Sequence, residues 1–521
     1  MSRLKSIMSS CHPTRRWVFV GLLALLAIFM TTSVFMANMM WVLLFANWLF
    51  EGRWDEKWKM ARSSRLLHAV VGLMIMLAVS LLWSQNVRYG FYDLQVKLPL
   101  LALPIVLLTT KPLEGRERSV VGFCYVNTVL VVTVITAVRM LTIDDLPYRE
   151  AVPFVSHIRF ALNVCLVIVL LAVSVWRLLG KGGNLWRVII MVLLIVWLAC
   201  FLLLIRSYTA AIVMAVAVTV VLIAFRKRYG RYGGWMVAVW VVMLLAVGGL
   251  TAKYVHDYYS LSPLARAELA PTTPNGRPYV HSSDGFIENG NYLNNYICRE
   301  ELLSEWPKRS QVPVDSLFGN GYELYPTMVR YLNAVGLPKD SLGVWSLTPT
   351  QVADIERGVA NPVYETFGLR RMVYVMLYEY ENYTHYGVMR DFSMLERFEL
   401  WSTGLRVLVD NPWFGVGIGD VPDELHARLE VDDSPLAGTV KHTHNQYIWL
   451  LMALGAVGGA IMLCLLLRAL LPGGRVAREL AADPVMTAFV IMVLVSFCSE
   501  DTLETLAGIL FCCFYLAFRH K

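Results

Sequence analysis

The sequence predicts an all-α polytopic membrane protein, and composition and hydropathy carry this prediction. Hydrophobic residues make up 57% of the 521-residue chain and charged residues only 16%, and the mean hydropathy is +0.54. A soluble chain of this length cannot bury so large an apolar fraction. Windows of about 20 apolar residues, enough to cross a hydrocarbon core of about 30 Å, recur along most of the chain. Each window must be helical, because lipid cannot satisfy an open backbone.

We expect about twelve transmembrane helices. The predicted spans are 17–36, 37–50, 66–84, 92–110, 119–139, 157–176, 187–205, 207–225, 233–251, 443–467, 485–499 and 502–518. Between the ninth and tenth spans lies a long stretch that carries aromatic residues and Gly/Pro breaks. The predicted organisation is therefore nine helices over 1–251, a large, mostly helical loop domain over 252–442, and three helices over 443–521.

Lysine and arginine gather in alternate short connections, such as residues 53–65 and 226–231, and at both ends of the chain. By the positive-inside rule, both termini are cytoplasmic and the large loop lies on the outer side. The net charge of +7 therefore reflects topology and requires no nucleic-acid partner. Nine cysteines are present, but only Cys298 faces outward, so neither an outer disulfide nor a Cys-x-x-Cys metal site is expected.

Two stretches of the loop domain predict helices. Thr348–Tyr364 begins with capping residues and contains Gly358, which indicates a short capped helix. Met394–Asp410 has apolar residues at helical spacing, with Leu395, Phe398, Leu405 and Leu408 expected on one face. The glycines of "NPWFGVGIGD" then break the helix. The segment Gly415–Asp420 is interpreted as a flexible break, or as a turn that offers N–H groups to an anion.

Several charges sit at the outer mouths of the spans. Lys97 lies inside its span, four residues after Asp93, so the two share a helix face. An ionisable group inside a span indicates either a functional cavity or a structural ion pair. His157 and Arg159 occupy another mouth, and Arg206 and Tyr208 form a tight outer turn at headgroup level. The Arg206 fork suits phosphate oxygens, and the alternative is simple anchoring to membrane lipids.

Three stretches together resemble the O-antigen ligase and polymerase superfamily, in particular the ligases of lipopolysaccharide assembly. "RFELWSTGLRVLVDNPWFGVGIGD" (Arg397–Asp420) is similar to the family's Arg-x-x-x-Trp helix and Asn-Pro/Gly-rich segment. "HTHNQYIWLLMALGAVGG" (His442–Gly459) is similar to its His-Asn-x-Tyr motif. "IRSYTAAIV" is near its Ser-Arg turn, although Tyr208 stands at the arginine position and Arg206 lies two residues earlier.

The resemblance implies an inverting glycosyltransferase in the bacterial inner membrane, with a periplasmic loop domain. Its donor is a glycan on undecaprenyl pyrophosphate and its acceptor is lipid A–core; no cofactor and no metal ion are expected. Arg206 and Arg397 are expected to stabilise the pyrophosphate as negative charge builds on it. His444 is the expected general base. Lys97, Arg159, His157, His442, Tyr208 and Trp401 are expected to bind substrate, with a buried anchor as the alternative for Trp401.

The remaining polar residues near these motifs have simpler interpretations. Asn445 is expected to cap the helix that follows it. Asp410, Asp420 and Asp423 show no ligand spacing and are interpreted as solvated loop residues. The acidic turn "CSEDTLE" (Cys498–Glu504) is also interpreted as solvated, with the minor alternative that it faces a mouth cation.

Three other functions compete with the ligase. A polymerase of the same superfamily and an oligosaccharide transferase to protein hydroxyls would both use the same donor. A transporter predicts broken helices with ionisable groups near the middle of the membrane. Because the charges here gather at the outer mouths, transport is the least favoured alternative.

Overall fold

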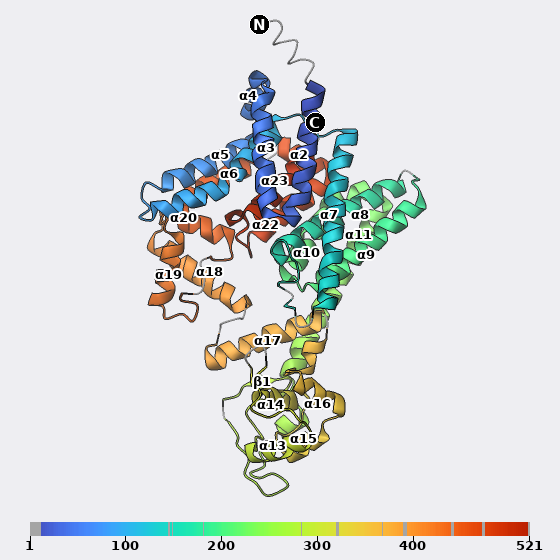
Figure 1. The fold of residues 1–521 in the computed structure, drawn as a ribbon, viewed down its shortest axis with the longest axis vertical. Helices are drawn as coiled ribbons and strands as arrows, with labels where there is room; N and C mark the ends of the chain where they lie inside the picture. Colours follow the sequence, from blue (N-terminus) through green and yellow to red (C-terminus); the bar gives the residue numbers. More distant parts are fainter. Residues whose placement is uncertain are drawn as a thin grey trace. The chain divides into compact units, whose positions relative to one another are not determined.

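A computed structural model describes residues 12–143, 146–147, 149–180, 182–282, 284–318, 322–366, 368–388, 393–438, 442–470 and 475–518. The basic residues Arg3, Lys5, Arg519 and Lys521 at the two ends of the chain lie outside these ranges, as does Cys11. The contacts divide the chain into two compact units, one made of residues 1–238 and 397–521 and the other of residues 239–396. Helices are the main secondary structure of both units, and the second also contains long loops (Figure 1).

The first unit contains most of the apolar helices. They are α2 (His12–Thr32), α3 (Val34–Glu51), α4 (Trp54–Ser63), α5 (Arg65–Ser80), α6 (Val87–Thr109), α7 (Gly115–Thr142), α8 (His157–Gly180), α9 (Leu185–Leu204), α10 (Tyr208–Phe225), α18 (Ser393–Asp410), α19 (Val421–Val431), α20 (Gln446–Leu470), α21 (Arg475–Ala482), α22 (Pro484–Ser496) and α23 (Leu506–Phe514). Three short 3-10 helices, η1 (Arg226–Tyr229), η4 (Thr502–Glu504) and η5 (Tyr515–Phe518), complete it. Helix α11 (Arg231–Tyr259) begins in this unit and continues into the second.

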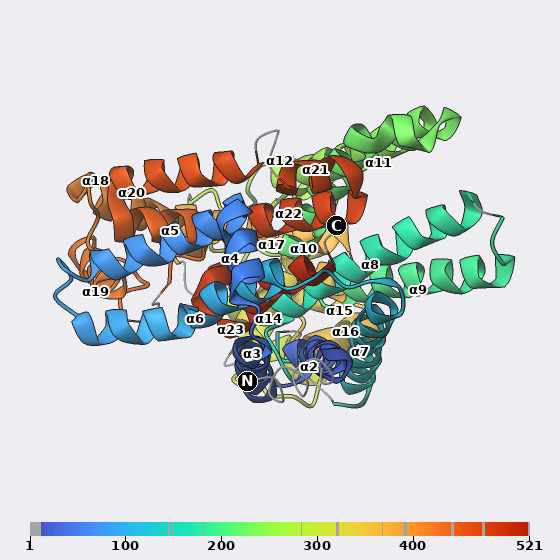
Figure 2. The ribbon, with the colours of Figure 1, turned by 90° about the horizontal axis from the view of Figure 1, so that it is seen from above.

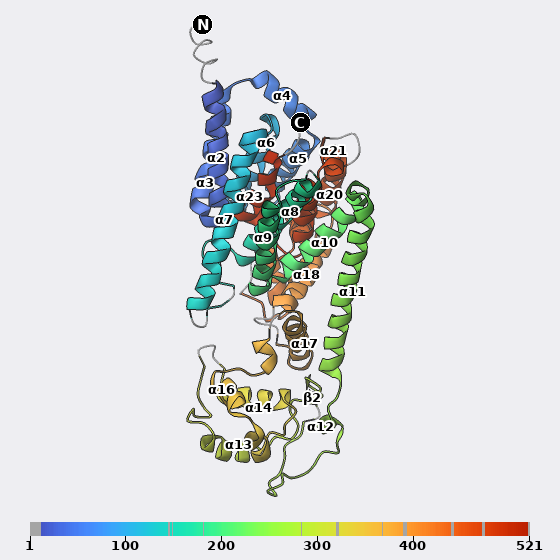
Figure 3. The ribbon, with the colours of Figure 1, turned by 90° about the vertical axis from the view of Figure 1, so that its right-hand side faces the viewer.

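The second unit is a small helical domain with one two-stranded ribbon (Figure 3). Its elements are α12 (Pro263–Arg266), β1 (Ile287–Glu288), β2 (Asn291–Tyr292), α13 (Arg299–Glu305), η2 (Trp306–Lys308), α14 (Leu324–Ala334), α15 (Ser341–Ser346), α16 (Pro349–Glu356), η3 (Pro362–Glu365) and α17 (Leu369–Tyr386). Strands β1 and β2 pair antiparallel, with Ile287 opposite Tyr292. The core includes the fully buried Trp306, Met328 and Leu332.

The helices agree with the predicted membrane spans. Within the described ranges, nine helices are long and apolar enough to cross a membrane, and the bent pair α4–α5 can supply a tenth. Two shorter apolar helices, Pro484–Ser496 and Leu506–Phe518, correspond to the last two predicted spans. An all-α polytopic membrane fold is therefore confirmed. Which side of the membrane residues 252–442 occupy, and hence the three-domain division, remain predictions.

Both consecutive helices and helices far apart in the sequence lie side by side in the first unit (Figure 2). α2 packs against α3 and α7, α8 against α9, and α20 against α5. Helix α10 packs against both α22 and α8, and Cys165 Sγ on α8 lies 3.6 Å from the Ala210 carbonyl oxygen on α10. Most of the predicted site residues lie at or just before the N-terminal ends of α8, α10, α18 and α20, and Lys97 lies within α6.

Helix α18 is present, but its predicted packing face is wrong. Phe398 and Leu405 are 53% and 46% exposed. The opposite face is buried, through Leu400, Thr403 and Val407. Gly404 explains why this face of α18 is the buried one, because a side chain at that position would meet Ile448 Cγ2 of α20 at 2.6 Å. The small residue lets α18 and α20 approach closely, and an apolar pattern alone cannot distinguish a helix-facing side from one that faces lipid.

The predicted flexible break at Gly415–Asp420 is also wrong. The segment crosses α20 at a kink, where Gly455 has φ 64° and ψ −171°. The Val416 and Gly417 amides donate to the Met452 and Ala453 carbonyls at 2.8 and 3.1 Å. A side chain at Gly455 would meet Trp413 carbonyl atoms at 2.4 Å. The two backbones therefore touch directly, which only glycine permits.

The remaining amides of this segment also have protein partners. Ile418 N–H donates to Ser80 Oγ at 3.0 Å and Gly419 N–H to Ser84 Oγ at 3.1 Å. Asp420 is not a solvated loop residue, since it is 7% exposed and accepts from the Gln85 and Asn86 amides at 2.7 Å each. The segment consequently has no free N–H groups for an anion at these positions, and it joins α18 rigidly to α5 and α6.

Candidate functional site

His444 precedes the first turn of α20 in an unusual backbone conformation. Its φ is 51°, in the left-handed region that side chains other than glycine seldom adopt. Holding a residue there costs about 1–3 kcal/mol, so the surrounding structure must enforce it. The next residue, Asn445, accepts from the Tyr447 and Ile448 amides at 3.0 and 3.1 Å. Asn445 is thus the helix cap that the sequence predicts.

The acidic turn between α22 and α23 holds the His444 loop. Asp501 accepts from the His444 amide at 2.8 Å and from the Asn445 amide at 3.0 Å. Glu500 and Asp501 are 5% and 4% exposed, so the interpretation of this turn as solvated is wrong. Burial, together with the charges of Glu504 and Glu500, raises the pKa of Asp501 to about 7. The turn is therefore a buried counter-charge to the mouth cations.

Arg397, at the start of α18, pairs with this turn. Its Nη2 lies 2.7 Å from Glu500 Oε1, and the two side chains are 15% and 6% exposed. Burial raises the pKa of Glu500, while the charges of Arg397 and Arg159 act in the opposite direction. Arg159 is thus close enough to act on Glu500, yet it forms no ion pair or hydrogen bond among the residues that the structure describes. Arg397 is therefore anchored by Glu500, and Arg159 is available to a ligand.

The same two arginines act on the His444 ring. Burial of the ring lowers the pKa of His444 to about 4, and the positive charges of Arg397, His442 and Arg159 add to the shift. The imidazole is therefore neutral at neutral pH. Its Nδ1 faces Asp501 Oδ2 at 3.7 Å, and the side chain is 43% exposed. That distance is too long for a hydrogen bond, so the ring is not held by Asp501 through this nitrogen.

Lys97 lies deeper, in a buried ion cluster. Its ammonium donates to both carboxylate oxygens of Asp93 at 2.7 Å, which confirms the predicted pair, and also to Glu504. The Lys97 side chain is 1% exposed. Glu504 also accepts from Gln446 Nε2 at 2.9 Å, and Gln446 Oε1 accepts from the Leu503 amide at 2.7 Å. The cluster therefore ties the start of α20 to α6 and the acidic turn.

The other predicted site residues, His157, Arg206 and Tyr208, lie at the N-terminal ends of α8 and α10. His157 lies within electrostatic range of Arg149, Arg397 and Arg159. Arg206 has a φ of 52° in the turn between α9 and α10. Because Ala210 lies beside Cys165, the Arg206 turn is level with about the second turn of α8. Tyr208 begins α10, so Arg206 and Tyr208 share this end of the unit without a described contact to His444.

His442 and Trp401 contact aromatic rings. The His442 ring packs on Trp449 with 5.1 Å between centroids. The ring therefore packs on α20, and it is also close enough to His444 to act on it electrostatically. Trp401 meets Phe398 edge to face at 5.4 Å. The Trp401 Nε1 is buried and has no hydrogen-bond partner among the described residues, a feature that fits either an anchor or a ligand contact.

An apolar groove of about 380 Å³ begins beside this site. It lies between α5, α6, α20, α22 and α23, and its walls are almost wholly aliphatic or aromatic. Tyr447 and Phe497 line its end near the acidic turn, with ring centroids 5.8 Å apart. Leu466 and Leu470 line its other end, near the C-terminus of α20. The groove therefore runs most of the length of α20, and one end of it lies at Tyr447, three residues after His444.

Sequence reasoning missed the acidic turn as part of the site. The available signal was three acids, Glu500, Asp501 and Glu504, placed between two apolar segments too short to leave them far from the membrane. Among the described residues, no group of three His, Cys, Asp or Glu side chains is arranged to hold a metal ion. The expected independence from a metal stays a prediction.

Comparison with known proteins agrees with the arrangement of the two motifs. The family model described as O-antigen ligase matches residues 346–463. This range includes α18, the Gly-rich segment that crosses α20, and the His444 loop. A search of curated proteins finds no significant match. The family match, and the two motifs that it contains, support a relationship of residues 346–463 to the O-antigen ligase superfamily.

Proposed function

We propose that this protein is an O-antigen ligase that moves a glycan from undecaprenyl pyrophosphate to a sugar of lipid A–core at the periplasmic face of the inner membrane. The observation that carries the proposal is the position of neutral His444 beside Arg397 and Arg159, at the end of an apolar groove. A lipid-linked pyrophosphate needs cations for its headgroup and an apolar surface for its chain. Both lie together in the first unit.

The proposed reaction begins with the acceptor. His444 Nε2 takes the proton of a sugar hydroxyl as its oxygen attacks the anomeric carbon of the donor. The bond from that carbon to the pyrophosphate oxygen breaks, and undecaprenyl pyrophosphate leaves with the bonding electrons. Attack opposite the leaving group inverts the anomeric centre. Arg397 and Arg159 stabilise the charge that develops on the pyrophosphate, where fixed cations contribute most.

The two arginines divide this task according to their partners. Arg397 is held by Glu500, so its position is set before the donor arrives, and Arg159 is available for a phosphate oxygen. Arg206, Tyr208, His157 and His442 are proposed to line the same mouth and contact the donor headgroup or its first sugar. For Lys97, the pairing with Asp93 and Glu504 favours a supporting role over direct contact with substrate.

A polymerase of the same superfamily is the nearest alternative, since it would use the same donor and the same residues with another lipid-linked repeat as acceptor. A transferase to protein hydroxyls would also use the same donor and would differ from the ligase only in its acceptor. The acceptor therefore has to be identified by experiment.

The test replaces His444 by alanine in cells and compares lipopolysaccharide with the lipid-linked glycan pool. A ligase defect leaves long glycans on undecaprenyl pyrophosphate and bare core. Core carrying a single repeat would indicate a polymerase, and unchanged lipopolysaccharide with lost glycoproteins would indicate transfer to protein. His426→Ala, which alters an exposed histidine on α19, is the matched control. Normal products from the His444→Ala strain in all these assays would refute the proposal.

A further inference from the structure

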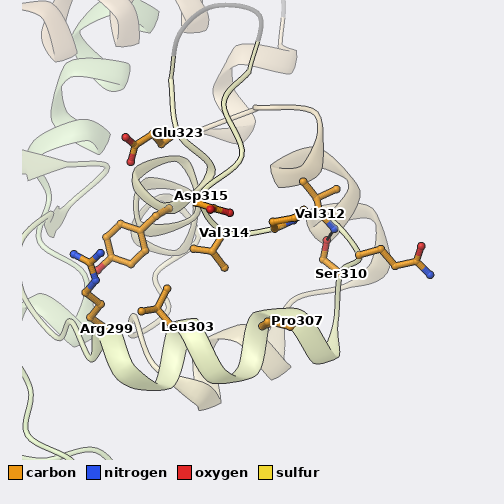
Figure 4. A pocket seen from close by; sticks show the side chains of 11 residues that line it. Arg299, Leu303, Pro307, Ser310, Val312, Val314, Asp315 and Glu323 are labelled. Atoms are coloured by element: carbon orange, nitrogen blue, oxygen red, sulfur yellow. Dashed lines mark hydrogen bonds between the residues drawn. The ribbon is translucent and has the colours of Figure 1, made fainter.

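The second unit contains a pocket of about 780 Å³ that the proposed transfer site does not use (Figure 4). Helix α13 and the turn η2 form one wall, from which Arg299, Leu303 and Pro307 project. The loop over residues 310–315 and the start of α14 form the facing wall. The volume falls within the range of about 300–1,000 Å³ that small-molecule sites occupy.

The lining combines an apolar floor with polar groups at its edge. Leu303, Val312 and Val314 supply aliphatic surface. The Arg299 guanidinium lies over the Tyr325 ring at 4.9 Å from its centroid, which orients both side chains. Five of the eleven lining residues are polar or charged, so the pocket offers a ligand both apolar and polar contacts.

Four polar side chains of the lining make no hydrogen bond or ion pair with the described part of the protein. Among the described residues, Gln311, Asp315 and Glu323 make no side-chain hydrogen bond or ion pair, and Arg299 contacts only the Tyr325 ring. By contrast, Ser310 is already engaged with Glu356 at 2.5 Å. The free groups comprise two carboxylates that only accept hydrogen bonds, a guanidinium that only donates, and an amide that does both. All four side chains are exposed to solvent, and together they suit a ligand that carries many hydroxyl-type donors and acceptors.

We propose that this pocket binds an uncharged stretch of glycan. Sugar hydroxyls donate to Asp315 and Glu323 and accept from Arg299, while the C–H face of a sugar ring packs on Leu303, Val314 and the Tyr325 edge. The two carboxylates repel phosphate and other anions, so a headgroup or a pyrophosphate does not fit. A lipid chain would make no use of the four polar groups. The inference rests on the proposed glycan transfer and adds a second contact for the same class of substrate.

The binding test uses the full-length protein in lipid nanodiscs. The probe is the oligosaccharide released by mild acid from the lipid-linked glycans of the host, detected by saturation-transfer NMR and titrated to obtain Kd. The variant Asp315→Asn/Glu323→Gln keeps the side-chain shapes and disturbs no described partner. Because each hydrogen bond to a charged group is lost or weakened, we expect binding at least about tenfold weaker than that of the parent chain.

Glu268→Gln is the matched control, since it makes the same chemical change at an exposed residue outside the pocket, and it should bind as the parent does. Tyr325→Phe, which keeps the ring, should bind much more tightly than Tyr325→Leu. No binding by the parent chain, or equal binding by the double variant and Glu268→Gln, would overturn the inference.

The experiments distinguish an error in the pocket inference from an error in the proposed function. If His444→Ala abolishes transfer while Asp315→Asn/Glu323→Gln binds glycan like the parent, the pocket inference is wrong and the ligase proposal stands. If His444→Ala still transfers glycan while the double variant loses binding, the pocket stands and the transfer proposal is wrong.

Discussion

At the scale of single residues, His444 combines a neutral ring with two neighbouring positive charges. Burial and these charges lower its pKa to about 4. Such a base is weak, because proton transfer is most effective when the pKa lies near the working pH. A bound pyrophosphate would offset the charges of Arg397 and Arg159, which stabilises the protonated ring and raises the pKa. The donor would then improve the base that acts on its own transfer.

This reasoning gives the first prediction. Addition of undecaprenyl pyrophosphate should raise the pKa of His444 from about 4 toward the ordinary histidine value of about 6.5. NMR titration of chain labelled at histidine measures it, with the His444→Ala spectrum to assign the signal. His426, exposed on α19, should keep its pKa. A His444 pKa that stays constant or falls on addition of the lipid contradicts the proposed headgroup position.

The second prediction concerns Arg397, whose role in the fold can be separated from its role in chemistry. Arg397→Gln leaves Glu500 buried without its cation, which costs about 3–5 kcal/mol of stability in buried pairs. Arg397→Gln/Glu500→Gln removes both charges and should recover most of the thermal stability. Transfer should stay low in both variants, because the cation next to the leaving group is missing. Melting temperature in detergent and initial transfer rates measure the two effects. Recovery of the rate together with the stability would mean that Arg397 acts only through packing.

At the scale of elements, the two family motifs form one structural unit. The Gly-rich segment donates two amides to the carbonyls exposed by the α20 kink, and Ala456 and Val457 donate back to Pro412 and Trp413 at 2.7 and 3.0 Å. This crossing places Arg397 at one end of α18 and His444 at the start of α20 in a fixed relation. The spacing between the motifs therefore reflects backbone contact as well as chemistry.

The third prediction follows from this crossing. Gly455→Ala introduces a methyl group that would meet Trp413 backbone atoms at 2.4 Å, at a φ of +64°. Since backbone cannot move aside as a side chain can, we expect a loss of more than about 3 kcal/mol and a clear fall in melting temperature. Gly21→Ala is the control: it lies in α2, where an added methyl group meets nothing within 4 Å. Equal melting temperatures for the two variants would contradict the close crossing.

Some local features were predictable from the sequence, because they depend on neighbouring residues. The Thr348 cap of α16 is present, with Gln351 completing the capping box, and Asn445 caps α20. The buried face of α18 was not predictable, because both of its sides carry apolar residues. The burial of Glu500 and Asp501 was not predictable either: their partners Arg397 and His444 lie more than fifty positions away in the chain.

At the scale of the whole molecule, hydropathy located the membrane helices well, since the cost of placing backbone and charge in lipid acts on every residue of a span. The groove between α5, α6, α20, α22 and α23 could not be predicted, because its walls come from segments up to about 450 positions apart and no local pattern specifies which helices neighbour one another. The side of the membrane on which each loop lies still rests on the charge distribution.

The fourth prediction tests that orientation. Leu342 and Trp54 are similarly exposed, at 55% and 54%, but lie in the outer loop and in a cytoplasmic connection of the predicted topology. In spheroplasts, a membrane-impermeant maleimide should label Leu342→Cys above the level of the parent chain. Trp54→Cys should gain label only after lysis. The reverse pattern would place the termini outside and His444 on the wrong face for a periplasmic acceptor.

The fifth prediction concerns the groove as the seat of the donor lipid. Leu466 lines its far end, and it lies 19 positions after Tyr447 on α20, or about 28 Å along the helix axis. Only a long prenyl chain reaches that far. Leu466→Trp fills this end at a cost of about 1–3 kcal/mol to a chain that must enter it, so the KM for a full-length undecaprenyl donor should rise about fivefold to a hundredfold. The same glycan on a short prenyl chain should show no change, and kcat should stay similar because the reacting atoms lie at the other end.

The adjacent Leu467 provides the control for this experiment. It is 47% exposed and does not line the groove, so Leu467→Trp adds the same bulk to the same helix on a different face. Steady-state kinetics with both donors in nanodiscs measure the four combinations. A KM that rises equally for long and short donors would mean that Leu466→Trp distorts the headgroup site instead. A KM unchanged for the long donor would mean that the undecaprenyl chain lies elsewhere, while the charges around His444 still receive its pyrophosphate.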